Sequence, residues 1–147
     1  MKKTAALILA LLGVTCPPLH AQQVFPPGTF AIDGFPVSCG GYPTVLAPQL
    51  QDAGFFDGRA LILNPIAIGR LPTPLKLYIY AHECAHGLGI MNEAEADCWA
   101  IRTGRDQSWF SPQAFNYLMM FFQNNPGSSR HPPGPARVRN MMACYEG

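Results

Sequence analysis

The spacing of apolar and histidine positions predicts a helix over residues 73–87. Four positions recur at helical intervals along one face: Leu75, Ile79, His82 and His86. Thr73 precedes Pro74, so we expect Thr73 to cap this helix and Pro74 to occupy its first turn. Gly87 and Gly89 are expected to end the helix in a sharp turn, because glycine tolerates positive φ.

Further helices are predicted toward the C-terminus. Asn92 and Glu95 form a capping-box pattern, and the helix that they begin is expected to end near Gly104. Two more helices are predicted over residues 111–123 and 135–145. In the first of these, one apolar stripe is expected in the core and consists of Phe115, Leu118, Met119 and Phe122. Two neighbours fall off the stripe and, if exposed, mark a surface for a peptide or protein partner: Met120 and Phe121.

Extended segments precede these helices. Residues 22–48 are rich in proline and glycine and predict short strands or a loop layer. A turn at residues 57–58 leads into an apolar strand over residues 59–64, which Pro65 closes. Because the helices follow the extended segments and no repeat occurs, the pattern predicts one α+β domain over residues 22–147.

The first 21 residues have the layout of a secretory signal peptide. Two lysines precede an apolar run over residues 5–14, and a small residue, Ala21, marks the expected cleavage point. The run is too short to span a bilayer, so no transmembrane segment is expected after cleavage. A lipid anchor at Cys16 is the weaker alternative, because Thr15 is bulky for that kind of site. The expected location is periplasmic or secreted.

Composition narrows the class of protein. The chain has 147 residues, of which 48% are hydrophobic and 13% charged, with a formal net charge of +1. That apolar content is above the disordered range, and the charge balance provides no basic face for nucleic acid. We therefore expect no nucleic-acid partner.

Four cysteines remain after removal of the signal peptide, and an even number in an exported chain suggests two disulfides. Their spacing does not determine the connectivity. We expect Cys98 to pair with Cys144 and Cys39 with Cys84. Although Cys84 lies between two histidines, a disulfide or buried thiol is favoured over metal binding there.

Residues 82–86 form the HExxH pattern. Two histidines four residues apart on a helix are close enough to bind one zinc ion, and Glu83 can reach a water on that metal and accept its proton. Zinc in a catalytic site takes three protein ligands.

Two residues compete for the place of the third ligand. Asn92 has a poorly ligating amide and already has a capping role, whereas Glu93 is charged and begins the next helix. Helix-dipole stabilisation is the alternative role for Glu93. Asp97 lies four residues further on, on the same face, and is placed to hydrogen-bond a ligating histidine.

Three motifs occur in a fixed order: HExxH at residues 82–86, ExxAD at residues 93–97 and HPxxxxR at residues 131–137. This order resembles the HtpX-like and CAAX-prenyl-protease family of gluzincin metallopeptidases. The resemblance implies a minimal zincin-like domain. It also implies that residues 58–64 are the edge strand that lines the substrate cleft.

The resemblance also implies residue roles. His82, His86 and Glu93 would be zinc ligands, Glu83 the general base and Asp97 the acid that supports a ligand. His131 would lie near the cleft and stabilise an oxyanion, or else be a solvated loop residue. Arg137 would be structural.

The expected function is that of a zinc endopeptidase acting on peptides or unfolded protein outside the cytoplasm. The alternative is a catalytically inactive, zinc-bound binding or assembly factor with the same fold, which holds a protein partner.

Overall fold

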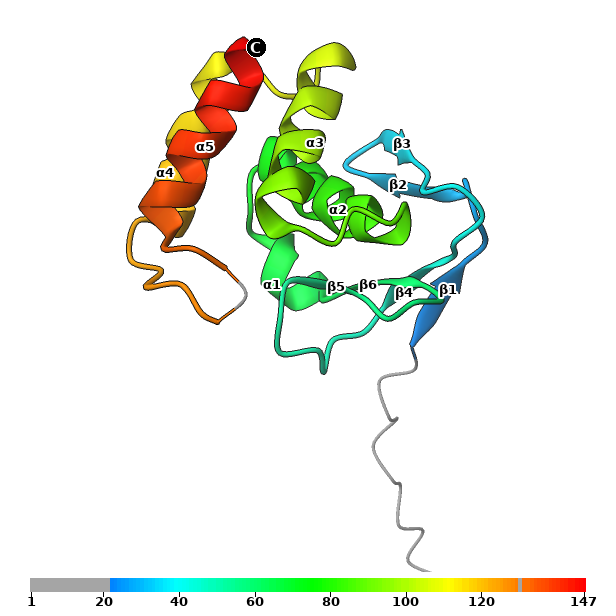
Figure 1. The fold of residues 1–147 in the computed structure, drawn as a ribbon. Helices are drawn as coiled ribbons and strands as arrows, with labels where there is room; N and C mark the ends of the chain where they lie inside the picture. The colour runs from blue at the N-terminus through cyan, green and yellow to red at the C-terminus, as the bar shows by residue number, and fades with distance from the viewer. Residues whose placement is uncertain (1–21, 130) are drawn as a thin grey trace, which may run out of the picture.

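The computed structural model describes residues 22–129 and 131–147 (Figure 1). The predicted signal peptide, residues 1–21, lies outside the described residues. Short strands precede helices along the chain, so the predicted α+β class is confirmed.

The larger sheet has the strand order β1-β4-β6-β5 (Figure 1). Its members are β1 (Gln23–Phe25), β4 (Thr44–Leu46), β5 (Gly54–Phe56) and β6 (Leu61–Leu63). β4 and β6 are parallel, with Val45 opposite Ile62, and the two outer strands pair antiparallel to them. A separate hairpin is formed by β2 (Phe30–Ile32) and β3 (Phe35–Val37).

The predicted edge strand is misplaced. The apolar segment before the metal-binding helix forms β6, which lies inside the sheet between β4 and β5. Leu61 and Leu63 are fully buried, because they share the face of β6 that packs against α2 and both edges of the strand are paired. The edge position belongs to β5, which follows Asp52 and Ala53 in the chain.

Pro65 closes β6 as predicted and also begins a short helix that the sequence analysis missed, α1 (Pro65–Gly69). The Asn64 side chain accepts hydrogen bonds from the backbone N–H groups of Ile66 and Ala67. Asn64 is therefore the N-cap of α1, and Pro65 occupies the first helical position.

The long helices form successive layers beside the sheet (Figure 1). α2 (Thr73–Gly87) packs against β5 and β6, α3 (Glu93–Asp106) packs against α2, and α5 (Gly134–Glu146) packs against α3. α4 (Phe115–Phe122), preceded by the 3-10 turn η1 (Pro112–Ala114), lies against α5. α2 therefore joins the strand layer to the C-terminal helices.

Two predicted helix boundaries are wrong. Thr73 does not cap α2, because its hydroxyl donates to the Asp33 carboxylate, and Lys76 binds the same carboxylate at 2.9 Å. Gly104 does not end α3. A Cβ at Gly104 would meet Phe110 at 2.6 Å and Trp109 at 2.7 Å, so this glycine allows the following chain to fold back onto the helix.

The core prediction for α4 is correct at three of four positions. Phe115, Leu118 and Phe122 are buried, but Met119 is 44% exposed, because α4 rests against its neighbours on a narrower face than expected. Met120 and Phe121 are exposed, at 69% and 42%.

Both expected disulfides are present. Cys39 pairs with Cys84 and Cys98 with Cys144. The first bond attaches the N-terminal segment to α2, and the second attaches α3 to α5. Two disulfides fit an oxidising compartment. Within the described part of the chain, no helix combines the length and apolar character needed to cross a bilayer.

Candidate metal centre

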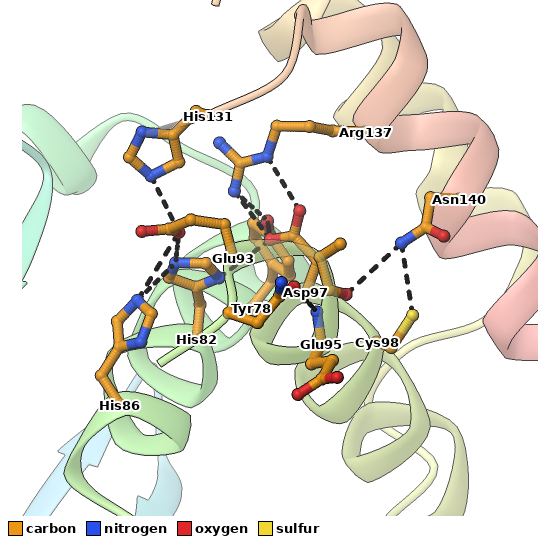
Figure 2. Close-up of polar contacts among 12 residues, drawn as sticks. Tyr78, His82, His86, Glu93, Glu95, Asp97, Cys98, His131, Arg137 and Asn140 are labelled. Carbon is orange, nitrogen blue, oxygen red and sulfur yellow. Dashed lines mark hydrogen bonds and ion pairs between the residues drawn. The ribbon is translucent and has the colours of Figure 1, made fainter. Parts of the chain in front are cut away.

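Three donor atoms converge where α2 faces the first turn of α3 (Figure 2). His82 Nε2 and His86 Nε2 lie 3.2 Å apart. Glu93 Oε2 lies 3.1 Å from His82 Nε2 and 3.6 Å from His86 Nε2. These three residues form a group that can hold a metal ion.

The distances between these atoms fit a single tetrahedral ion. With zinc–ligand bonds of about 2.0–2.1 Å, adjacent ligand atoms lie roughly 3.3–3.4 Å apart. Glu93 Oε2 is buried and accepts no aligned hydrogen bond from the imidazoles around it. Buried polar atoms without a hydrogen bond are uncommon in proteins, and an ion bound between this oxygen and the imidazole nitrogens would account for this one.

The turn between α2 and α3 explains how residues only seven positions apart converge. Gly89 has a φ of +91°, so the chain reverses direction sharply after α2. Gly87, expected to serve the same purpose, lies within the helix, and its lack of a side chain gives room to the rings of Phe56 and Tyr42. Asn92 Oδ1 accepts from Glu95 N, so the amide caps α3, whereas Glu93 Oε2 points at the histidines.

Each histidine presents Nε2 because its other nitrogen is engaged. His86 Nδ1 lies 2.8 Å from the carbonyl oxygen of Ile90 in the interhelical turn. His82 Nδ1 lies 2.8 Å from Asp97 Oδ1 in an ion-pair contact, although without the alignment of a hydrogen bond. A protonated Nδ1 at an oxygen leaves the lone pair on Nε2 free for a metal, which is the usual arrangement around zinc.

Asp97 is the centre of a buried polar network behind the ligands (Figure 2). Arg137 on α5 donates from Nε to Oδ2 at 2.8 Å and from Nη2 to Oδ1 at 2.7 Å. Tyr78 Oη donates to Oδ1 at 2.6 Å. The sequence analysis expected Asp97 and Arg137 near the site but missed Tyr78. Its position one helical turn before His82 was the available signal.

The charges of this network follow from its contacts. Burial raises the pKa of Asp97, but Arg137 and His82 more than offset it and bring the pKa to about 2. Burial lowers the pKa of His82, but Asp97 and Glu93 raise it to about 9 in the metal-free protein. A proton and a metal ion would therefore compete for the lone pair on His82 Nε2, beside Glu93, while Asp97 remains at Nδ1.

The Glu83 side chain extends from α2 toward the edge strand β5. A Cβ at Gly54 would meet Ile79 Cγ2 at 2.9 Å and Glu83 Cγ at 3.1 Å, so only glycine lets the strand approach this closely. Burial raises the pKa of the Glu83 carboxyl above its usual value; His82 and His86 offset this only in part, and the Glu93 carboxylate adds to the rise.

His131 reaches the site from the loop between α4 and α5. Its Nε2 lies 2.9 Å from Glu93 Oε2. Ser128 Oγ accepts from His131 N and lies 3.3 Å from His131 Nδ1, so the loop fixes the ring. Gly127, at a φ of +84°, makes room for the backbone of residues 131–133. Burial lowers the pKa of His131, and Glu93 partly offsets this effect.

The donor atoms and Glu83 line an open cleft of about 940 Å³. β5 with the preceding residues lines one part of the cleft, and the end of α4 with the loop that carries His131 lines another. A second groove of about 600 Å³ runs along α3 near Trp99 and Asn140, away from the ligands.

No family model matches this chain, and neither the curated proteins nor the solved structures provide a match.

Proposed function

We propose that the protein is a zinc-dependent endopeptidase that cleaves peptides or unfolded protein outside the cytoplasm. The observation that carries the proposal is the convergence of His82, His86 and Glu93 within 3.6 Å, in an open cleft that Glu83 also lines. The order of the HExxH, ExxAD and HPxxxxR motifs supports a gluzincin of the HtpX-like kind. The disulfides and the leader-like first residues support export.

The chemistry divides among residues of the cleft. A zinc ion held by His82, His86 and Glu93 would polarise the scissile carbonyl and lower the pKa of the attacking water. Glu83 accepts the proton of that water on its carboxylate and delivers it to the departing nitrogen.

The open edge of β5 supports the binding of an extended substrate. Ala53 O accepts from Asn64 N and Asp57 N donates to Ala60 O at the two ends of β6, so Gly54, at an alternate position, directs its backbone groups away from the sheet. A peptide can add to such an edge through main-chain hydrogen bonds.

His131 is the proposed donor to the oxyanion. As a neutral imidazole held by Ser128, it can donate from Nε2 to negative charge that develops on the carbonyl oxygen. We expect His131→Ala to keep zinc bound while kcat falls about 100-fold. Loss of zinc together with activity would instead assign His131 to the metal site.

Cleavage of fluorescently labelled, unfolded casein tests the function. Glu83→Gln is expected to retain zinc and lose at least about 100-fold in kcat. Glu95→Gln is the matched control, because Glu95 is an exposed acid on α3 and its activity should equal that of the wild type. If the wild type and both variants bind zinc but cleave no casein, the inactive binding factor is favoured. If the protein binds no metal, both the peptidase and the zinc-bound binding factor are contradicted.

A further inference from the structure

Three large apolar side chains are exposed around the rim of the cleft. They come from separate segments: Phe55 from β5, Met91 from the turn before α3 and Phe121 from α4. Their side chains are 43%, 75% and 42% exposed. Single exposed apolar residues are ordinary on protein surfaces, but a group around one concave site marks a binding surface.

The charges of the lining point to the kind of ligand. Among the described lining residues, the acids are Asp52, Glu83 and Glu93. The one arginine of the described lining is Arg137, which is 8% exposed and already bonded to Asp97. Outside the candidate metal position, no lysine or arginine of the described lining is therefore left to pair with an acidic side chain of a ligand.

We infer that the cleft selects extended segments with bulky apolar side chains on both sides of the reacting peptide bond, and that it rejects acidic side chains there. Phe55 and Phe121 line the cleft from two separate elements, β5 and α4. This inference rests on the proposed function, because it names the substrate class of the same site. It makes Phe55, Met91 and Phe121 the residues that determine specificity.

Three quenched fluorescent peptides of equal length test this inference. They differ only in the residues that flank the centre: leucine with phenylalanine, alanine with serine, or aspartate with glutamate. We expect the zinc-loaded protein to cleave the apolar peptide with a kcat/KM about ten-fold above that of the small neutral peptide. The acidic peptide is expected to be the poorest substrate.

Single substitutions distinguish an effect of the rim residues from an effect of exposed apolar residues elsewhere on the protein. Phe121→Ser and Phe55→Ser are expected to lower kcat/KM for the apolar peptide about ten-fold and to leave the small neutral peptide unaffected. Met120→Ser is the matched control, because Met120 is 69% exposed on the same helix and is absent from the cleft lining. Its kinetics should equal those of the wild type.

A binding assay distinguishes this inference from the proposed function. The same peptides, labelled for fluorescence anisotropy, are titrated into zinc-loaded Glu83→Gln protein. If the Glu83→Gln protein prefers the apolar peptide but the wild type cleaves none of the peptides, the peptidase function is overturned and the apolar binding surface is supported. Cleavage with equal kcat/KM for all three peptides, unchanged by Phe121→Ser, would overturn the surface and leave the peptidase standing. Neither binding nor cleavage would overturn both.

Discussion

At the scale of single residues, the centre depends most on Asp97. This carboxylate is 1% exposed and binds Arg137, Tyr78 and His82, which come from two other helices. Burying an ion pair contributes little net stability, but removing one partner leaves the other charge buried and unpaired. Asp97 therefore orients a metal ligand and also holds α3 to α5.

We expect Asp97→Ala to lower the free energy of unfolding by about 3–5 kcal/mol, because Arg137 loses its partner. Zinc affinity should fall about 10- to 100-fold, because His82 loses the oxygen that orients it. Urea unfolding and competition with a zinc chelator measure the two effects. Asp106→Ala is the control, since its pair with Arg105 lies at the surface and contributes at most about 1 kcal/mol. Equal effects of the two substitutions would contradict this account.

At the scale of secondary structure, the site is assembled by the contact between β5 and α2. The strand carries glycine where it crosses the helix, and Glu83 lies against that glycine. The disulfide at Cys84, next to Glu83 in the chain, attaches the opposite side of α2 to the N-terminal segment. The metal-binding helix is thus held from both sides.

Gly54→Ala should displace Glu83 or Ile79, because the new methyl group would lie 2.9–3.1 Å from their side chains. We expect a loss of about 1–3 kcal/mol in stability. Activity on unfolded casein should fall further than zinc affinity, because Glu83 moves and the ligands do not. Gly69→Ala is the matched control, as a Cβ there meets nothing within 4 Å. A Gly54→Ala protein with wild-type kcat would show that the close approach is irrelevant to the reaction.

The two disulfides close loops of nearly equal length, 45 and 46 residues. Replacing either pair by alanine should therefore cost a similar amount, about 4 kcal/mol in the chain-entropy model. Urea unfolding of Cys39→Ala/Cys84→Ala and of Cys98→Ala/Cys144→Ala, each compared with the wild type, measures these costs. A difference of several kcal/mol between the two variants would show that native contacts, rather than loop closure, dominate.

At the scale of the whole molecule, we expect metal binding and folding to be coupled. The ligands lie on two helices, and the residues that orient them lie on α2, α3 and α5, so the site exists only when these layers are assembled. A ligand that binds only the folded state stabilises it, by about 4 kcal/mol at a thousand times its Kd.

This coupling should depend on pH. The pKa of His82 rises from 6.5 to about 9 on folding without metal. The folded state then holds the proton more tightly than the unfolded state. The resulting stability is present below pH 6.5 and is lost as pH rises toward 9. Metal and proton compete at His82, so zinc should restore the stability that the metal-free protein loses at alkaline pH.

Thermal unfolding with EDTA or with zinc, across this pH range, measures the effect. We expect the Tm of the EDTA-treated protein to fall as pH rises and the Tm difference between the two forms to widen. A difference that narrows with rising pH would contradict competition at His82.

The motif residues and the long helices could be predicted because their signals are local. The interval between His82 and His86 places them on one face of a helix whatever the rest of the chain does, and the Asn92 cap fixes where the next helix begins. The order of extended segments and helices was likewise sufficient for the α+β class.

Strand order was not predictable, because it depends on pairing between distant segments. An apolar run such as Leu61–Leu63 has the same pattern inside a sheet as at a buried edge, and only the partners β4 and β5 decide. The same reason explains why Gly104 lies within α3: the contact with Trp109 and Phe110 outweighs the tendency of glycine to end a helix.

The sequence by itself indicated the candidate ligands and the candidate base, because side-chain chemistry and helical periodicity are properties of short segments. Only the tertiary structure decided that Tyr78 completes the Asp97 network, that β5 rather than β6 flanks Glu83, and that His131 reaches Glu93. These are contacts across many residues of chain, and they are set by the packing of whole helices and strands.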